Sequence, residues 1–237
     1  MLTRSARVAL VMFRARLPAA SSTPQGSRIF SSNFGSRPFS TAVRYSSDMA
    51  PIKTLMILPE GAEEMEAVIT ADVLRRAGIE VIIAGLDGSG PVKCSRDVVL
   101  MPDVSLEEAV KSRGPFDAVI LPGGLGGTER LKASDAVKNV LKNQENDGKL
   151  VAAICAAPLA LKAHGIGQGK KVTNYPALED QMAGDGYTYL QDRVVEDGKL
   201  ITSRGPGTAF EFALALVKHL KSKEASDELI GPLLLKL

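Results

Sequence analysis

The sequence predicts an α/β fold, a doubly wound sandwich in which helices cover both faces of a mostly parallel central sheet. Short apolar runs alternate with stretches of helical periodicity along the chain. Residues 53–58, 63–77 and 79–84 form a strand, a helix and a strand, which implies parallel strands joined by a right-handed crossover. Apolar runs at residues 117–121 and 150–155 continue the same pattern.

Residues 1–48 differ in composition from the rest of the chain. They contain seven arginines, ten serines, no lysine and a single acidic residue, Asp48. This composition is typical of a transit peptide, so we expect a disordered leader that directs the protein to the mitochondrion. The alternatives are a disordered basic tail or an artefact of gene prediction, because translation could start at Met49 and would then give a complete domain and a cytoplasmic form.

Residues 49–237 are enough for one well-buried domain and not comfortably enough for two. The leader carries +7 − 1 = +6 of a net charge of +2, so the remaining residues carry −4 and give no nucleic-acid signal. No apolar run is long enough to span a membrane. Two cysteines make no disulfide framework or CxxC pair, and His164 and His219 fit helix ends better than ligands, so we expect no metal.

The first half of this domain contains further helices between its strands. The helix at residues 63–77 ends at Gly78 and places four apolar side chains on one side: Met65, Ile69, Val73 and Leu74. Residues 96–102 are expected to be extended or to form an edge hairpin. Ser105 begins a helix with Glu108 completing a capping box, and another helix follows at residues 134–146.

The second half ends in helices. The helix after Cys155 is expected to end near Gly165. Four elements follow before the C-terminus: a strand at 171–173, a short helix at 177–182, a hairpin formed by 194–195 and 199–202, and a buried helix at 208–220. Residues 224–237 are predicted to form an extra amphipathic C-terminal helix.

The run LVAAICAAP, residues 150–158, indicates a buried strand that turns sharply into a helix at Cys155. The free N–H groups at the start of that helix would favour a thiolate and lower the thiol pKa from about 8.5. Cys155 is therefore a candidate nucleophile on a strand-to-helix elbow. The alternative is a buried cysteine that acts as a small hydrophobic residue.

Loops after three strands are expected to meet at one edge of the sheet, since ligands bind beyond the carboxyl ends of parallel strands. Gly123 and Gly124 follow the strand at 117–121, and the N–H groups of Gly124 and Ala156 could form an oxyanion hole beside the sulfur of Cys155. A tight turn that needs positive φ is the alternative explanation of the glycine pair.

Three acidic residues open the first helix, where carboxylates are favourable anyway. Glu66 differs from its neighbours because it can point over the edge of the sheet toward Cys155. A nearby ionised carboxylate would raise the thiol pKa, so a working pair requires Glu66 to hold a proton while the sulfur is ionised.

Six motifs, in this order and spacing, give the chain a resemblance to the ThiJ/PfpI (DJ-one) superfamily and to its deglycase members: EGAEEMEAVITADVLRRAG, VKCSRDVV, LPGG, AAICAAP, KVTNYP and TSRGPGTAFEFALA. The resemblance covers residues 53–237 and leaves out only the leader. It implies one flavodoxin-like domain that forms a homodimer and has a cofactor-free site. In the deglycase members the C-terminal segment would restrict access to that site.

The resemblance also implies roles for individual residues. Cys155 would be the nucleophile, Glu66 its protonated partner, and Gly124 and Ala156 the oxyanion-hole amides. Pocket residues are implied at five positions: Gly123, Arg96, Arg76, Tyr175 and Pro206. Arg76 and Arg96 would also lie along the dimer seam, and Gly205 and Pro206 would pack near the site across the dimer. Cys155 and Cys94 would be oxidation-sensitive, with Cys94 a structural or modifiable thiol.

The chain departs from the family pattern at four positions. Tyr175 replaces a histidine, Leu125 an asparagine, Ala157 a glycine and Met101 a cysteine. These changes affect the expected substrate fit and rate more than the nucleophile.

The function implied is attack of a thiolate on methylglyoxal or an early glycation adduct, protective in oxidative stress. The alternative is a redox sensor and redox-gated chaperone that responds to oxidation of Cys155. The expected partners are a second copy of the chain, reactive carbonyl compounds and glycated proteins. A peptidase or glutamine amidotransferase is disfavoured because Ala156, rather than a histidine, follows Cys155.

Overall fold

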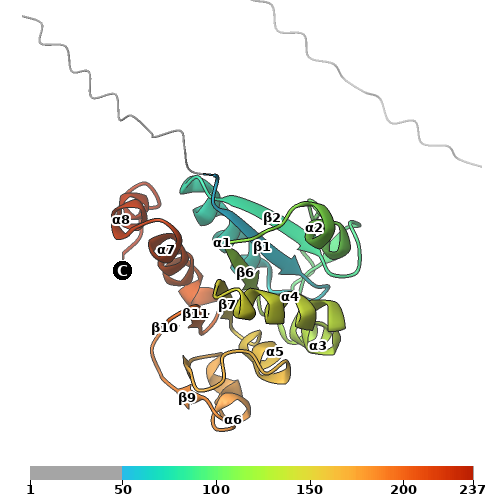
Figure 1. Cartoon of the computed structure of the whole chain (residues 1–237). Coiled ribbons are helices and arrows are strands. Elements are labelled where there is room, and N and C mark those ends of the chain that lie inside the picture. Colours follow the sequence, from blue (N-terminus) through green and yellow to red (C-terminus); the bar gives the residue numbers. More distant parts are fainter. Residues whose placement is uncertain (1–49, 237) are drawn as a thin grey trace, which may run out of the picture. The chain divides into compact units, whose positions relative to one another are not determined.

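The computed structural model of the protein describes residues 50–236 (Figure 1). The predicted leader lies outside the described residues, so the localisation inferred from it stays a prediction. No helix within the described part is long and apolar enough to cross a membrane.

A seven-stranded sheet forms the centre of the domain, in the order β10-β11-β7-β6-β1-β2-β5. Its strands are β1 (Lys53–Leu58), β2 (Glu80–Gly85), β5 (Val104–Ser105), β6 (Ala118–Leu121), β7 (Leu150–Ile154), β10 (Val194–Asp197) and β11 (Leu200–Ser203). Every neighbouring pair is parallel except β10 and β11, which form the predicted hairpin. The α/β class and the mostly parallel sheet are therefore confirmed.

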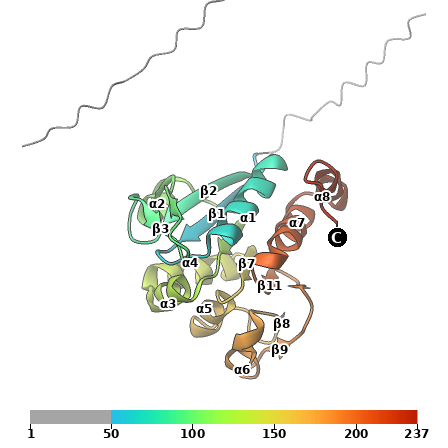
Figure 2. The ribbon, with the colours of Figure 1, turned by 180° about the vertical axis from the view of Figure 1, so that it is seen from behind.

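Helices cover both faces of this sheet (Figures 1 and 2). One face packs against α1 (Glu64–Arg76), α7 (Ala209–Leu220) and α8 (Lys223–Ile230). The other packs against α2 (Leu106–Ser112), α3 (Leu125–Ala133), α4 (Asp135–Asn146) and α5 (Pro158–Ala163). Shorter elements lie outside the main sheet: β3 (Val92–Lys93), β4 (Val99–Leu100), β8 (Lys171–Val172), β9 (Thr188–Tyr189), α6 (Glu179–Met182) and the 3-10 turns η1 (Pro176–Leu178) and η2 (Pro206–Thr208).

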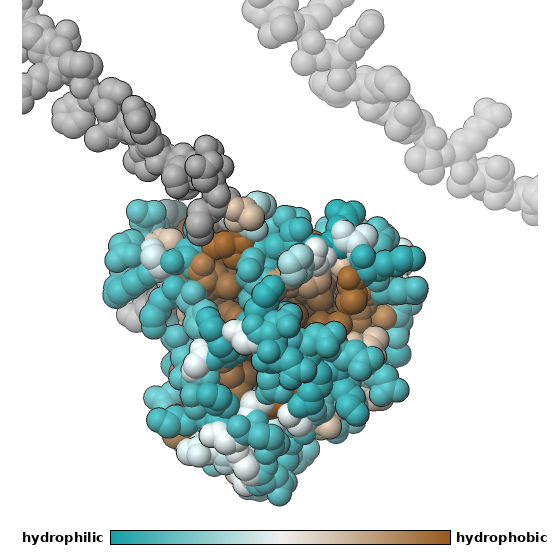
Figure 3. All heavy atoms as spheres, in the orientation of Figure 1, coloured by the Kyte–Doolittle hydropathy of each residue, from teal (hydrophilic) through white to brown (hydrophobic). Residues whose placement is uncertain are grey.

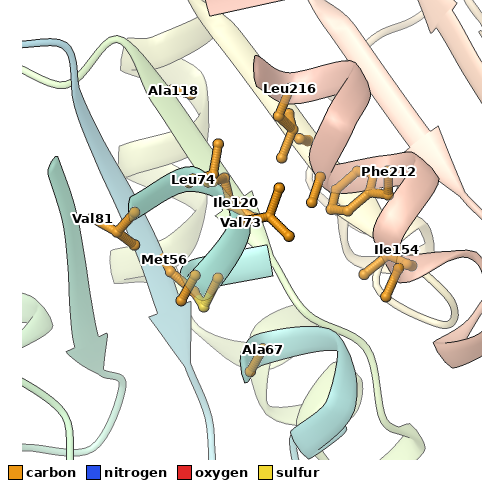
Figure 4. Close-up of a cluster of buried hydrophobic side chains, with 14 of the residues drawn as sticks. Met56, Ala67, Val73, Leu74, Val81, Ala118, Ile120, Ile154, Phe212 and Leu216 are labelled. Atoms are coloured by element: carbon orange, nitrogen blue, oxygen red, sulfur yellow. The ribbon is translucent and has the colours of Figure 1, made fainter. Parts of the chain in front are cut away.

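The alternation of side chains along each strand produces two hydrophobic cores. Along β1, Met56 and Leu58 belong to the core under α1 and α7, whereas Leu55 and Ile57 belong to the core under α2 to α5. Figure 4 shows the first core, in which Phe212 of α7 and Leu74 of α1 approach the strands. Strands buried on both faces explain the continuous apolar runs in the sequence.

Several local predictions need correction. Met65 is 51% exposed instead of facing the core, because the helix buries Glu64 and Glu66 on either side of it. Helix α3 was not predicted, because Gly126 and Gly127 weaken its helical pattern. The segment at 96–102 forms a hairpin with β3 that is separate from the main sheet. Figure 3 shows that most of the visible surface is hydrophilic, with apolar residues exposed between the helices.

Other boundary predictions are confirmed. Ser105 caps α2 by accepting the N–H of Glu108 over 3.2 Å. His164 lies at the C-terminal end of α5, where Nε2 is 2.9 Å from the carbonyl oxygen of Leu131, and His219 lies in the last turn of α7. A C-terminal helix is present as α8 and packs on α7, but it spans Lys223–Ile230 and ends before the predicted boundary at residue 237.

Candidate active site

The chain reverses its direction through the sheet between β1 and β6, since β2 and β5 continue on one side and β7 and β11 on the other. Ligands bind beyond the carboxyl ends of the strands at such a switch point. The loops that follow β6 and β7 carry Gly123 and Cys155 to this point, and the first turn of α1, which follows β1, carries Glu66.

Cys155 follows β7 directly and has a φ of 64°, in the left-handed region that non-glycine residues seldom adopt. Its N–H donates to the carbonyl oxygen of Ser203 in β11, and its own carbonyl oxygen accepts the N–H of Tyr175 over 2.8 Å. A residue held in this strained conformation by its neighbours is typical of functional sites. The predicted elbow is present, and the thiol is buried with 9% exposure.

Gly123 separates Cys155 from Glu66 and leaves no room for a side chain. A Cβ atom at this position would lie 2.6 Å from Cβ of Cys155, 2.8 Å from Oε2 of Glu66 and 2.8 Å from the carbonyl oxygen of Ile154. The glycine therefore allows the cysteine and the glutamate to approach each other. The position of Gly123 in the sequence did not show that a glycine is needed there; the short distances to Cys155 and Glu66 do.

Glu66 is fully buried, and the N–H of Gly123 donates to its Oε2 over 2.7 Å. Oε1 is also buried, and no nitrogen or oxygen of the described residues donates to it. Burial, with a smaller contribution from the nearby charge of Glu63, raises the pKa of Glu66 to about 7 against the opposing hydrogen bonds with Gly123 and the Cys155 thiol. A carboxyl group in this environment can hold a proton near neutral pH.

The pKa of Cys155 differs from the expectation of a lowered value. While Glu66 is ionised, burial together with the charge and the hydrogen bond of that carboxylate raises the pKa of the Cys155 thiol to about 12, against the lowering effect of hydrogen bonds with the N–H groups of Gly124 and Ala156. The two predicted amides thus face the sulfur, but α5 is only six residues long and their effect is smaller than that of the buried carboxylate. The two groups titrate as a coupled pair that carries one proton and one negative charge above about pH 7.

Gly124 brings its N–H to the sulfur through an unusual backbone conformation. Its φ is 90°, and a Cβ atom there would lie 2.3 Å from the carbonyl oxygen of Gly61. The turn that requires positive φ at Gly124 therefore also directs its N–H toward Cys155, while the role of this N–H in an oxyanion hole stays a prediction.

A cavity of about 510 Å³ opens beside Cys155. It is lined by Gly61, Glu63, Ser95, Arg96, Gly124, Leu125, Gly126, Cys155, Ala156, Tyr175 and Pro206. Three of the predicted pocket residues, Arg96, Tyr175 and Pro206, thus lie around the thiol. Pro206 reaches this cavity from the same chain, and its position near the site across a dimer stays a prediction.

Two predicted pocket residues lie elsewhere. Arg76 is in the last turn of α1, ten residues and therefore about 15 Å along the helix from Glu66, where its Nε pairs with Asp72 over 2.8 Å. Gly123 lies beside the thiol but does not line the cavity. No residue of α8 lines the cavity either, because this helix packs on α7, so within one chain it does not restrict access to Cys155.

Cys94 lies at the end of β3 and is 4% exposed. Burial raises its pKa to about 11, and the charges of Glu64 and Glu63 act in the same direction. A neutral, buried thiol is a poor nucleophile, which agrees with a structural role. Among the described residues, no group of three or more His, Cys, Asp or Glu side chains is arranged to hold a metal ion.

Sequence reasoning missed the roles of Glu63, Glu64 and Ser95. Glu63 caps α1 by accepting the N–H of Glu66 over 2.8 Å, and it also lines the cavity. Glu64 is buried and accepts a hydrogen bond from Ser95 Oγ over 2.9 Å. The run of three acidic residues is visible in the sequence. Carboxylates are favourable at any helix N-terminus, so the pattern gave no reason to assign a separate role to each of them.

Residues 52–219 match the DJ-1/PfpI family. The chain is 56% identical to the Parkinson disease protein 7 homolog of Danio rerio over 189 residues, which cover 79% of this chain and all of that protein. It is 44% identical to the glutathione-independent glyoxalase DJR-1.2 of Caenorhabditis elegans over 189 residues, or 79% of this chain and 99% of that protein. The crystal structure of Drosophila melanogaster DJ-1beta superposes with a TM-score of 0.76 at 50% identity, covering 79% of this chain and all of that one.

Proposed function

Because the chain belongs to the DJ-1/PfpI family, we propose that it is a cysteine-dependent glyoxalase-type enzyme and protein deglycase that needs no cofactor. The substrates would be methylglyoxal and early glycation adducts. One observation carries the proposal: a fully buried carboxyl group, Glu66, lies beside the thiol of Cys155, which lines a cavity and has two N–H groups directed at its sulfur. A relative named as a glutathione-independent glyoxalase supports the same reaction class.

The reactive form would hold its single proton on Glu66 and its negative charge on Cys155. Two N–H groups, from Gly124 and Ala156, are available to a thiolate, whereas Glu66 has one N–H, from Gly123. A protonated Oε1 could donate to the sulfur and would then no longer be buried without a partner. Cys155 also lines the cavity while Glu66 is fully buried, so water and substrate reach the charge more easily on the sulfur.

The reaction would begin with attack of the thiolate on the aldehyde carbon of methylglyoxal, forming a C–S bond. The aldehyde oxygen takes up the proton of Glu66, which gives a hemithioacetal and an ionised carboxylate. The carboxylate then removes the proton from the carbon bonded to sulfur, and the electron pair left behind forms an enediolate with the neighbouring carbonyl group. The carboxyl group returns this proton to the neighbouring carbon, while the hydroxyl proton passes from the first oxygen to the second. The product of this transfer is a thioester of lactate, and water hydrolyses it to lactate and the free thiol.

Three groups of the site contribute to these steps. Glu66 lies against the thiol and is therefore within reach of a carbon bonded to the sulfur. The N–H groups of Gly124 and Ala156 would stabilise the charge first on sulfur and then on the substrate oxygen. The phenol of Tyr175, on the cavity wall, is placed to contact the rest of the substrate.

The direct test is turnover of methylglyoxal by residues 49–237, with lactate as the measured product. The Cys155→Ala and Glu66→Gln variants serve as matched controls, since each removes one member of the pair. Turnover in the parent above a thiol blank, lost in Cys155→Ala, supports the proposal. No turnover above that blank would rule it out.

The second candidate function is a redox sensor and redox-gated chaperone. The same two N–H groups that face the sulfur could hold the oxygens of a sulfinate formed by peroxide at Cys155. Peroxide-dependent suppression of aggregation of a client protein, absent in Cys155→Ala, would favour this function.

We also propose that the protein forms a homodimer and is imported into mitochondria. The exposed apolar residues of α1 and the β3–β4 hairpin offer surface that a second copy would bury: Met65, Val68, Val98, Val99 and Met101. Light scattering of residues 49–237 tests the proposed homodimer, because it measures the mass of the particle in solution. The mature N-terminus tests the proposed import, since cleavage near Arg44 supports import and a start at Met49 opposes it.

A further inference from the structure

Glu64 is a buried acidic residue that has no place in the reaction described above. It is 7% exposed at the start of α1 and does not line the cavity. Its carboxylate oxygens accept hydrogen bonds from the β3–β4 hairpin. Ser95 Oγ donates to Oε2 over 2.9 Å, and the N–H of Arg96 donates to Oε1 over 2.9 Å and to Oε2 over 3.2 Å.

The two residues held by Glu64 form one wall of the cavity. Ser95 and Arg96 both line it, and Arg96 is the one cationic residue among the lining residues. Its guanidinium donates to the carbonyl oxygen of Ser95 over 3.0 Å and is otherwise exposed. The position of this positive charge therefore depends on the backbone of the turn that carries it.

That backbone is attached to the rest of the site at few points. The N–H of Ser95 donates to the carbonyl oxygen of Ala62 over 2.8 Å, and the N–H of Cys94 donates to that of Val98 within the turn. The N–H of Arg96 is directed at Glu64. Asp97, the next residue, has a φ of 66°, as in a tight turn. At Arg96 itself, the backbone is held by its hydrogen bonds to the carboxylate of Glu64.

We propose that Glu64 is a positioning residue, which holds the turn of Ser95 and Arg96 against α1 so that the guanidinium of Arg96 stays at the mouth of the cavity. The positive charge then favours anionic over neutral electrophiles at Cys155. This inference rests on the proposed function only where it concerns the natural substrate, because the placement of Arg96 can be measured without turnover.

The sign of the effect separates positioning from simple electrostatics. Removal of a carboxylate near the cavity makes the site more positive and would by itself favour an anionic reagent. If Glu64 acts by holding Arg96, its removal has the opposite result. A structural role alone would lower stability without a change in preference between reagents.

The experiment compares the rates at which iodoacetate and iodoacetamide alkylate Cys155, followed by mass spectrometry of the peptide that contains it. The expected ratio of the two rates falls about fivefold in Glu64→Ala, as for a partly screened surface charge. Arg96→Ala should lower the ratio to the same level, and Glu64→Ala should add nothing in that background. Glu60→Gln is the matched control, because it removes an exposed carboxylate that pairs with Arg130 over 3.1 Å and should not lower the ratio.

Glu64→Gln covers the case in which Glu64→Ala does not fold, because it keeps the side-chain length and should lower the ratio by about twofold. An unchanged or increased ratio in the folded Glu64 variants would overturn the inference. The inference would also be overturned if Glu64→Ala lowered the ratio of rates in the Arg96→Ala background as much as it does in the parent. Alkylation needs no methylglyoxal turnover, so a failed glyoxalase assay leaves this result intact, and a failed alkylation test leaves the proposed function intact.

Discussion

Gly123 donates its backbone N–H to Oε2 of Glu66 over 2.7 Å, and this hydrogen bond fixes a buried carboxyl group beside the thiol of Cys155. The same residue leaves no space for a Cβ atom, which would lie 2.6 Å from Cβ of Cys155. The pair on which the proposed chemistry depends therefore requires a glycine between its two members.

Gly123→Ala should disrupt the site more than it disrupts the fold. The added methyl group must displace Glu66 or Cys155, and we expect a loss of about 1–3 kcal/mol in the free energy of unfolding. Displacement of the pair should lower kcat/KM for methylglyoxal at least about 100-fold. Urea unfolding and steady-state kinetics measure the two effects.

Gly126→Ala is the matched control for stability. The nearest atom to a Cβ there is 3.9 Å away, and the residue lies in helix α3, where alanine is favoured by about 1 kcal/mol. This variant should be as stable as the parent or more so. A Gly123→Ala variant that matches Gly126→Ala in stability and keeps parental kinetics would contradict the packing argument.

The pH dependence of kcat/KM should follow the first ionisation of the pair. The reactive state holds one proton, so activity should rise with pH through a midpoint near 7, the value to which burial raises the pKa of Glu66. Glu66→Gln keeps the shape of the side chain but cannot move a proton, so the plateau value of kcat/KM should be at least about 100-fold below that of the parent. Parental rates and an unchanged pH profile in this variant would show that Glu66 takes no part.

Glu66 should also reduce stability as the pH rises. Below its ordinary pKa of 4.5 the carboxyl group is protonated in both states and has no effect. Between 4.5 and about 7 the unfolded chain releases the proton before the folded chain does, so the parent loses stability until the folded pKa is passed. At about 1.4 kcal/mol per pH unit, the loss is about 3 kcal/mol.

Glu66→Gln has no such proton to release. Its free energy of unfolding should therefore gain on the parent by about 3 kcal/mol between about pH 4.5 and pH 7 and stay constant above. Denaturant unfolding of both proteins across this range is the measurement. Parallel curves would mean that Glu66 is less buried or better compensated than the structure indicates.

Much of the fold could be predicted because periodicity reports burial directly. The strands at residues 53–58, 118–121 and 150–154 are buried along almost their whole length and are largely apolar runs. Helix α3 was missed because two glycines weaken its helical pattern, and one of them, Gly127, is required for close packing against Ala62 and Pro59. The family resemblance, carried by whole motifs, is confirmed by the match of residues 52–219.

The site residues could be named from the sequence more easily than their ionisation could. The elbow at Cys155 follows from a strand that ends in small residues, and the N–H groups follow from the elbow. The net effect on the thiol pKa depends on burial and on the distance to Glu66, which are tertiary quantities. Within one chain Arg76 lies away from the cavity, because a motif does not show which end of a helix faces it, and its place along a dimer seam stays a prediction.

Titration of the Cys155 thiolate by its ultraviolet absorbance, in a Cys94→Ser background, tests the central claim most directly. If Glu66 holds the shared proton, thiolate should appear with a midpoint near 7, and Glu66→Gln should not lower that midpoint. Appearance of thiolate only near pH 12, with a lower midpoint in Glu66→Gln, would place the proton on the sulfur and contradict the account.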